Sequence, residues 1–135
     1  MPVARYETIR LLLAISALES WDIQVLDVKT AFLYGELEEE IYMEQPEGFV
    51  VKGQENKVYH LKRALYGLKQ VSHAWNKQAD KSLKQLGFKR CISDSGIYVR
   101  YKDNTTTICV LYVDNILFMG SNSCELKLVK ESFMK

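Results

Sequence analysis

The clearest structural signal in the sequence is the stretch TTICVLYVDNILFM, residues 106–119. Two runs rich in β-branched and apolar residues, 106–113 and 116–119, are separated only by Asp114 and Asn115. Runs of this kind joined by two polar turn residues predict a β-hairpin. We therefore expect two antiparallel strands whose tight, charged turn is Asp114–Asn115.

Helical and extended patterns alternate ahead of this hairpin, and a helical one follows it. Apolar residues at three- and four-residue spacing predict helices over 4–20, 72–86 and 123–133, with N-caps at Ser72 and in 121–123 and a left-handed stop at Gly87. Short apolar or β-rich segments predict strands over 21–28, 39–45, 58–61, 88–91 and 97–101. The predicted fold is α+β: a small antiparallel sheet that carries Asp27 and the hairpin, packed on one face by the three helices.

Length and composition are those of one domain, residues 1–135. Of these residues 47% are hydrophobic, which is enough to form a core. The three cysteines include no C-x-x-C pair, so we expect neither a disulfide framework nor a zinc site, and an intracellular, reducing setting. A signal peptide is the alternative interpretation of the apolar run 11–18, but Glu7 and the continuing helical pattern favour an amphipathic helix. No segment reaches the roughly 20 apolar residues that span a bilayer.

The net charge of +1 conceals a division along the chain. Residues 22–55 are strongly acidic, and residues 57–90 are strongly basic apart from Asp80. Such a division suits a cation site beside a polyanion-binding surface, with the basic helix over 72–86 as a candidate for that surface. Two ordinary solvated faces are the alternative interpretation of the same charges.

Asp27, at the end of a predicted strand, and Asp114, at the hairpin, are candidate metal ligands. Carboxylates on stiff elements are a recurrent way to hold divalent cations for phosphoryl transfer, because Mg²⁺ prefers hard oxygen ligands. Each aspartate alone has a structural explanation, since Asp is common in turns and at strand ends. Pattern alone favours that structural explanation.

Several motifs around these aspartates resemble copia-type retrotransposon reverse transcriptases. They are LDVKTAFLYG (26–35) followed by IYMEQPEGF (41–49), LYGLKQ (65–70) with Ala74-Trp75, LGF (86–88), and LYVD (111–114) with Ile116-Leu117. The opening, Ala4-Arg5 and ETIR (7–10), matches as well. The motifs occur in the family's order and cover nearly the whole chain.

The resemblance implies the palm of an RNA-directed DNA polymerase from a Pol polyprotein, which binds an RNA or DNA template with its primer and deoxynucleotides. Asp27, Asp114 and the Val28 carbonyl would bind Mg²⁺, with Mn²⁺ as a substitute, and Asn115 stands at a further metal position. Phe32 and Gln70 match nucleotide-contacting positions, and Tyr112 would lie near the primer terminus. The resemblance also implies an intracellular, cytoplasmic location, which in active relatives is a virus-like particle.

The sequence also departs from the family. Members normally carry Asp where this chain has Asn115, so one metal-site charge is missing and we expect weakened catalysis, although some viral RNA polymerases use Asp-Asn at the equivalent hairpin. His73 replaces the usual arginine, which puts a phosphate contact in doubt, because a neutral imidazole does not replace a guanidinium. The turn Asp94-Ser95-Gly96 replaces the usual Asp-Pro-Ser, and we expect no functional effect there.

The fingers, thumb and RNase H portions of the family are expected to be missing from this chain, which should leave apolar surface exposed and solubility poor. Two other classes of function stay open. One is a non-catalytic, degenerate transposon remnant without a biochemical role. The other is a small RNA-recognition module, which the sequence disfavours because no strand carries paired aromatic and basic residues for base stacking.

Overall fold

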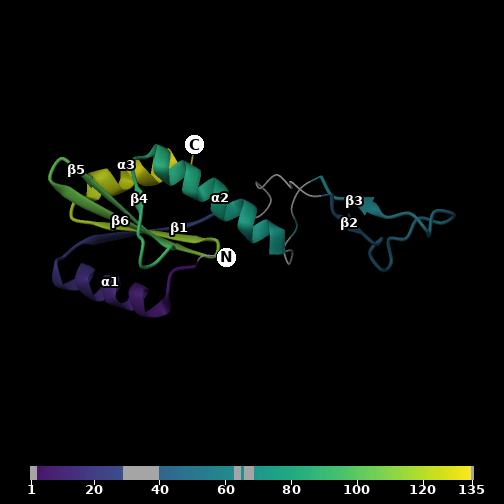
Figure 1. Ribbon diagram of the computed structural model, residues 1–135, viewed down its shortest axis with the longest axis horizontal. Coiled ribbons are helices and arrows are strands. Elements are labelled where there is room, and N and C mark those ends of the chain that lie inside the picture. Colours follow the sequence, from purple (N-terminus) through teal and green to yellow (C-terminus); the bar gives the residue numbers. More distant parts are fainter. Residues whose placement is uncertain (1–2, 29–39, 63–64, 66–68, 135) are drawn as a thin grey trace. The chain divides into compact units, whose positions relative to one another are not determined.

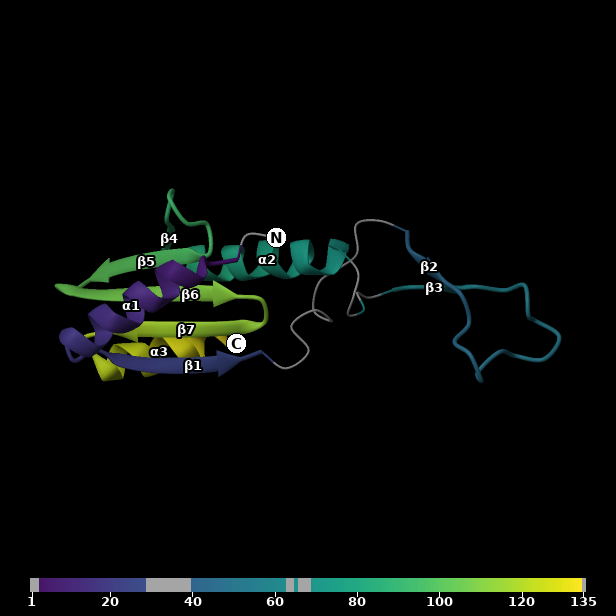
Figure 2. The same ribbon diagram turned by 90° about the horizontal axis from the view of Figure 1, so that it is seen from below.

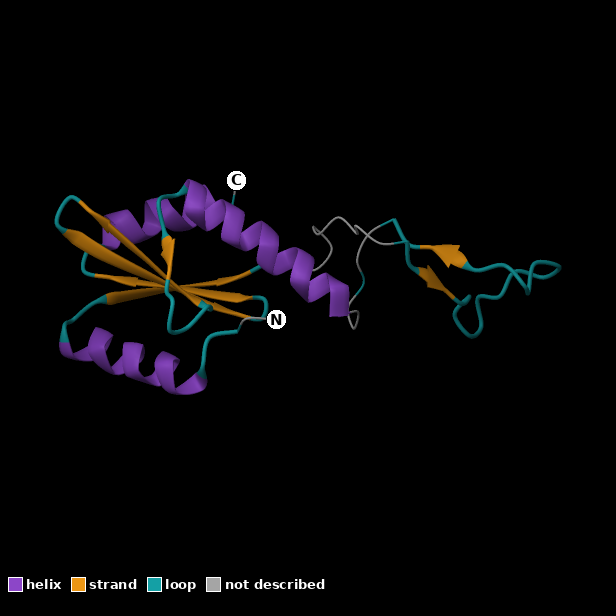
Figure 3. Ribbon diagram, viewed as in Figure 1, coloured by secondary structure: helices purple, strands orange, loops and turns teal. Residues whose placement is uncertain are grey.

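The computed structural model describes residues 3–28, 40–62, 65 and 69–134, with the side chains of 69–71 outside that description. Helices are α1 (Tyr6–Leu18), α2 (Lys69–Gln85) and α3 (Ser123–Phe133), and strands are β1 (Asp22–Asp27), β2 (Tyr42–Met43), β3 (Tyr59–His60), β4 (Lys89–Arg90), β5 (Ile97–Lys102), β6 (Thr105–Tyr112) and β7 (Asn115–Gly120) (Figure 3). The α+β class is confirmed, and each predicted helix and strand is present with shifted ends.

The chain divides into two compact units, residues 1–29 with 76–135, and residues 30–75. The larger unit holds α1, α3, most of α2 and five strands, and the smaller one holds the β2–β3 ribbon. A single domain over 1–135 stays a prediction.

The five strands of the larger unit form one antiparallel sheet in the order β1-β7-β6-β5-β4. β7 lies between β1 and β6, and β1 forms an edge of the sheet. Figure 2 shows the end of β1 and the β6–β7 turn at the same end of the sheet. The candidate metal ligands at these two places are therefore brought to one end of the sheet by the strand order.

Helices cover both faces of this sheet, and the prediction that they pack on one face is wrong. In Figure 1 α1 lies on one side of the sheet, whereas α3 and the larger unit's part of α2 lie on the other. The reason is visible in β6, where the successive residues Cys109, Val110 and Leu111 are all buried. Neighbours along a strand point to opposite faces, so a strand that buries each of them needs a cover on both.

The α1 face holds an aliphatic cluster. Its buried members are Ala4, Ile97, Val110 and Met119, with Ile9, Leu12, Trp21, Cys91, Ile108 and Leu117 packed against them. The outer side of α1 stays exposed, with Leu11 60% and Leu18 84% accessible. This confirms the predicted exposed apolar surface, because leucines at these positions contact no cover in the described chain.

The opposite face holds the aromatic part of the core. Phe118 is fully buried between Phe88 and Phe133, with ring centroids 6.2 and 6.1 Å away. Tyr98 is also buried and donates a hydrogen bond of 2.9 Å from its hydroxyl to the Asp80 carboxylate of α2. Burial, followed by the hydrogen bond to Asp80, raises the pKa of Tyr98 and keeps it a neutral donor.

An arginine joins α2, β5 and α3 on this face. Arg100 donates to the Leu86 carbonyl (3.0 Å), pairs with Glu125 and lies 5.3 Å from the centre of the Phe88 ring. Both charged side chains of the pair are largely covered, at 12% and 20% exposure. Such a pair must stay intact, since removing one partner would leave the other charge buried.

The helix ends agree with the sequence in two of three places. Asn122 caps α3 by accepting from the Glu125 N–H (3.1 Å), and Gly87 has the left-handed φ of 85° expected after α2. The prediction of Ser72 as an N-cap is wrong, because α2 already begins at Lys69.

The smaller unit contains the antiparallel β2–β3 ribbon and a loop that the side chain of Gln45 holds together by hydrogen bonds. Both ends of the Gln45 amide are used: it donates to the carbonyls of Gln54 (2.7 Å) and Lys57 (2.9 Å) and accepts from the Val51 N–H (2.9 Å). All residues from 46 to 60 are exposed. Throughout the described residues, no helix has the length and apolar character to cross a membrane.

Candidate metal and nucleic-acid site

Asp27 and Asn115 lie opposite each other on neighbouring strands. The register of β1 and β7 pairs Asp27 with Asn115, and the register of β6 and β7 pairs Asn115 with Tyr112. Side chains at directly opposite positions start about 4.5–5.5 Å apart at Cβ. Three of the predicted site residues are thus in one row across the sheet.

The register also decides the face on which this row lies. Val110 and Leu117 are opposite each other and belong to the α1 cluster. Tyr112 and Asn115 lie two residues further along their strands, and a strand repeats every two residues. Asp27, Asn115 and Tyr112 are therefore on the α1 face, beyond the end of the aliphatic cluster.

The β6–β7 turn is formed by Val113 and Asp114, so the predicted turn Asp114–Asn115 is wrong by one residue. The turn rules favoured the Asp-Asn pair, because both residues tolerate unusual backbone conformations. In the fold Val113 has φ of 57°, whereas Asn115 is the first residue of β7. A positive φ at the first central residue is the mark of a type II′ turn, which normally has glycine there.

This turn is strained, and the adjacent one is not. The β5–β6 hairpin turns at Asp103 and Asn104, with φ of 48° and 61°, both residue types that enter this region readily. Val113 is β-branched, and such a residue at positive φ is an outlier that costs roughly 1–3 kcal/mol. The strain is located next to the candidate metal ligand Asp114.

Backbone and side-chain hydrogen bonds hold Asp114 to its neighbours. The Val28 N–H donates to the Asp114 carbonyl (3.2 Å), which extends the β1–β7 pairing to the turn. The Asn115 amide nitrogen donates to Asp114 Oδ1 (3.1 Å). Asn115 therefore occupies one oxygen of the carboxylate that the sequence assigns to metal binding.

The donors present fit a divalent cation, with one charge fewer than a site of three carboxylates. Asp27 and Asp114 offer carboxylate oxygens, and the carbonyls of Val28 and Asn115 offer neutral ones, a hard-oxygen set of the kind that Mg²⁺ prefers. Asp27 is exposed and Asp114 partly exposed, so both are accessible to a cation. Among the described residues, no group of three His, Cys, Asp or Glu side chains could hold a metal.

The other predicted site residues belong to the smaller unit, residues 30–75. Phe32 lies outside the described residues. Gln70 is in the first turn of α2, and its side chain is outside the description as well. His73 is exposed on the same helix.

The lysines of the basic helix lie on the other face of the sheet from Asp27. Lys77, Lys81 and Lys84 are exposed on α2, whose Asp80 contacts the aromatic face through Tyr98. Lys84 also forms an ion pair with Asp80 (2.7 Å). A polyanion-binding role for this helix stays a prediction, and its residues 76–85, which belong to the larger unit, lie across the sheet from the row at Asp27.

Comparisons with known proteins assign the family. The family model described as reverse transcriptase (RNA-dependent DNA polymerase) matches residues 1–135. The retrovirus-related Pol polyprotein from transposon TNT 1-94 of Nicotiana tabacum is 43% identical over 122 residues, which are 90% of this chain and 9% of that protein. The corresponding polyprotein from transposon RE2 of Arabidopsis thaliana is 40% identical over 126 residues, 93% of this chain and 9% of that protein.

The chain belongs to the reverse transcriptase family. More narrowly, its plant relatives confirm the resemblance to copia-type retrotransposons, and the yeast Ty1-DR5 Gag-Pol polyprotein is 32% identical over 105 residues, 77% of this chain and 6% of that protein. The chain spans about a tenth of the length of the plant relatives. No solved structure gives a significant match.

Sequence reasoning missed two features of this site. The strain at Val113 was not predicted, because the turn rules put Asp114 and Asn115 at the turn. The strand register could have revealed it, since Tyr112 and Asn115 can pair only if Val113 and Asp114 form the turn. The turn 94–96 was considered only for its departure from Asp-Pro-Ser, and no role was assigned to Asp94, which is buried and accepts several hydrogen bonds.

Proposed function

We propose that this chain is the palm segment of a copia-type retrotransposon reverse transcriptase, in which Asp27 and Asp114 hold divalent metal for nucleotidyl transfer to a primer end. The observation that carries the proposal is the contact between β1 and the β6–β7 turn, where Val28 donates to the Asp114 carbonyl and Asp27 faces Asn115. Family membership supports the chemistry, and this contact brings the two aspartates to one end of the sheet.

Each residue has a distinct part in the proposed reaction. Asp27 and Asp114 would hold Mg²⁺, or Mn²⁺ in its place, together with the backbone carbonyl of Val28 and the amide oxygen of Asn115. When bound, the metal supplies charge stabilisation for the attacking and leaving oxygens of an in-line displacement. The strained turn at Val113 presents Asp114 in one fixed backbone orientation, since strain persists only where its surroundings determine the conformation.

Nucleic-acid and nucleotide contacts complete the proposal. Tyr112 shares the face and the row of Asp27 and is 39% exposed, which leaves its ring available to the primer terminus. Phe32 and Gln70 would contact the incoming deoxynucleotide by family resemblance. The template and primer are RNA or DNA, and a cytoplasmic setting is proposed because all three cysteines are free thiols.

We further propose that Asn115 impairs this site. Asparagine lacks the charge of the family's aspartate, and its amide group also donates to Asp114 Oδ1 (3.1 Å). A cation at this position would have to compete with that hydrogen bond. Losing one electrostatic contact to a transition state costs roughly 10²–10³ in rate.

The hydrogen bond from Asn115 to Asp114 also favours a second candidate function class, the non-catalytic remnant. In that case the amide would keep one oxygen of Asp114 occupied, no metal would be held and the fold would persist without turnover.

The experiment is primer extension with Mg²⁺ or Mn²⁺, on the chain joined to fingers and thumb segments. Asn115→Asp should raise the extension rate by about 10²–10³, and Asp114→Asn should abolish extension. Asp103→Asn is the matched control, because it removes the same group from the neighbouring β5–β6 turn and should leave the rate unchanged.

Equal rates for the parent chain and its Asn115→Asp variant, both extending primers, would refute the impairment. If Asn115→Asp is as silent as the parent, the remnant is the better description, and His73→Arg becomes the next restoration to assay.

A further inference from the structure

Asp94 is a buried carboxylate between β4 and β5 that holds the start of α1. It is 7% exposed and accepts hydrogen bonds from the Arg5 N–H (3.0 Å), the Thr8 hydroxyl (2.7 Å) and the Gly96 N–H (3.1 Å). Arg5, at the N-cap of α1, makes no capping bond of its own. Asp94 therefore caps this helix from a segment that is distant in the sequence.

The charge of Asp94 is maintained by its partners. Burial raises the pKa of a carboxyl group, but the hydrogen bonds from Arg5, Thr8 and Gly96 outweigh it, and the pKa of Asp94 is lowered. A carboxylate has enough acceptor sites for all three donors, whereas its carboxamide analogue has one oxygen.

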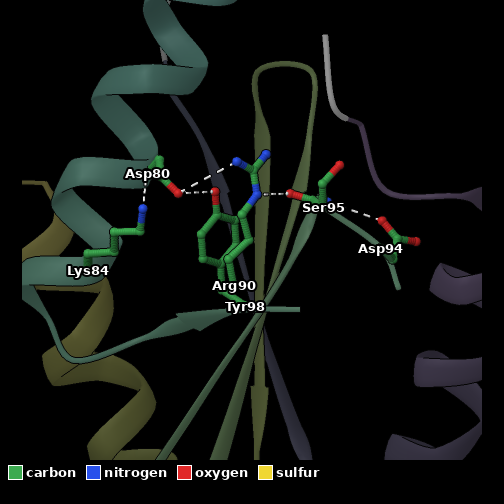
Figure 4. Close-up of polar contacts among 7 residues, drawn as sticks. Asp80, Lys84, Arg90, Asp94, Ser95 and Tyr98 are labelled. Atoms are coloured by element: carbon green, nitrogen blue, oxygen red, sulfur yellow. Dashed lines mark hydrogen bonds and ion pairs between the residues drawn. The ribbon is translucent and has the colours of Figure 1, made fainter. Parts of the chain in front are cut away.

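The same turn is held from the aromatic face. Arg90 donates from Nε to the Ser95 carbonyl (2.7 Å), and its guanidinium lies 3.8 Å from the Asp80 carboxylate. Figure 4 shows Asp80, Arg90, Ser95 and Asp94 one beside the next in space around this turn. The turn is thus anchored to α2 on one side and to α1 on the other.

The backbone continues from this turn to the β6–β7 hairpin. The Leu111 N–H donates to the Gly96 carbonyl (2.8 Å), and the Ala4 N–H donates to the Leu111 carbonyl (3.3 Å). A Cβ on Gly96 would lie 2.2 Å from the Ala4 nitrogen, so the two backbones are in direct contact. Leu111 directly precedes Tyr112 at the end of β6.

We propose that Asp94 is a positioning residue for the β6–β7 hairpin, acting through Gly96, Ala4 and Leu111 on the turn that carries Asp114. The inference rests on the proposed function only where it assumes that the hairpin carries a metal ligand. The coupling itself is a property of the fold.

A strained turn needs such support. Val113 holds a φ of 57°, which relaxes unless the ends of β6 and β7 are fixed. β7 is fixed by β1 on one side, whereas the end of β6 is fixed on its other side by the contacts of Leu111 with Gly96 and Ala4. Loss of the Asp94 charge would first weaken the contact between Ala4 and Leu111, because Asp94 holds the neighbouring residue Arg5.

Amide hydrogen exchange on the chain tests the coupling by reading two sites. The Leu111 N–H bonds to Gly96 and the Val28 N–H bonds to Asp114, so these amides report the turn end of β6 and the turn itself. Asp94→Asn should increase exchange at both amides by about tenfold more than at core amides such as Phe118, whose exchange reports the loss of global stability.

Matched variants separate positioning from general stability. Thr8→Val removes one hydrogen-bond donor to Asp94 without changing the shape of the side chain, and it should increase the exchange rates at Leu111 and Val28 by less than Asp94→Asn does. Thr8→Ser keeps the hydroxyl donor and should leave these exchange rates at the parent values. Glu125→Gln makes the same carboxylate-to-amide change in the Arg100 pair, away from the turn, and should leave the ratio of hairpin to core exchange unchanged.

The outcomes are distinct from those of the proposed function. If Asp94→Asn speeds exchange at Leu111, Val28 and Phe118 by the same factor, Asp94 only stabilises the fold and the positioning role is refuted. An equal hairpin effect of Glu125→Gln would refute it too.

Mn²⁺ broadening of the Val28 and Asn115 amide resonances tests the metal site separately. Absence of broadening in the parent chain would contradict the metal proposal and leave the exchange result standing. Where broadening occurs, Asp94→Asn should require a several-fold higher Mn²⁺ concentration for the same effect, and an unchanged concentration would overturn the functional part of the inference.

Discussion

The two faces of the five-stranded sheet differ in what their residues do. The face under α2 and α3 is filled by large aromatic side chains and by ion pairs that join three elements, such as Arg100 with Glu125. The α1 face has a smaller aliphatic cluster, and beyond its end lie Asp27, Asn115 and Tyr112. Stability and the candidate chemistry are thus largely separated across one sheet, because successive residues of each strand point to opposite sides.

The largest effect should come from the aromatic face. Phe118→Ala should lower the free energy of unfolding by about 3–5 kcal/mol, because it removes a fully buried ring packed between Phe88 and Phe133. Urea denaturation measures it. Val25→Ala, at an exposed position of β1 on the α1 face, is the control and should cost less than about 1 kcal/mol. Similar losses for both variants would contradict the separation of the faces.

Acid should weaken both faces through one carboxylate on each. Burial raises the pKa of a carboxyl group, but the hydrogen bonds to Asp94, and the contacts of Asp80 with Lys84 and Tyr98, outweigh burial and lower both pKa values. The unfolded chain then binds more protons than the folded one, so stability is present above the unfolded pKa of about 4 and is lost as the pH falls through the folded values.

Thermal unfolding between pH 7 and pH 2 measures this loss. Asp94→Asn and Asp80→Asn should each flatten the acid limb and cost about 1–3 kcal/mol at pH 7, since each removes charged hydrogen bonds. An acid limb that keeps its slope in both variants would show that other carboxylates cause it.

The strained turn gives a smaller effect of opposite sign. Val113→Asn should raise the free energy of unfolding by about 1 kcal/mol, because asparagine enters the left-handed region more easily than valine. Asn104→Val in the β5–β6 turn is the mirror control and should lower stability by a similar amount. A loss of stability in Val113→Asn, measured by thermal unfolding, would mean that the valine side chain contributes more than its backbone costs.

The smallest effect should change sign with metal. Asn115→Asp brings a second carboxylate to Asp114, and two charges about 4 Å apart in a solvated site repel by about 1 kcal/mol. Without divalent cations the variant should melt slightly below the parent. With Mg²⁺ it should melt above, because binding to the folded state adds stability. If Mg²⁺ leaves the melting temperature unchanged in both the parent chain and Asn115→Asp, this result would argue against metal binding.

Some parts of the site could be predicted from the sequence, and others could not. Asp27 and Asp114 were proposed as metal ligands because the motifs around them resemble a family, whereas their spacing alone suggested ordinary turn and strand-end residues. The β6–β7 hairpin was predicted, but its turn was off by one residue, because the rules for turn residues do not include the pairing of β1 with β7. Asp94 gave no signal, since its donors at Arg5 and Thr8 are distant in the sequence.

The sequence by itself determined the α+β class, the approximate places of the helices and strands, and the family. These depend on local periodicity, on caps such as Asn122 and on motifs of neighbouring residues, all of which act over a few positions. Only the tertiary structure decided that helices cover both faces, that Val113 takes the strained conformation, and that Asn115 donates to Asp114. Each of these follows from the register of strands that are remote in the chain, and the register is set when the whole sheet buries its two faces together.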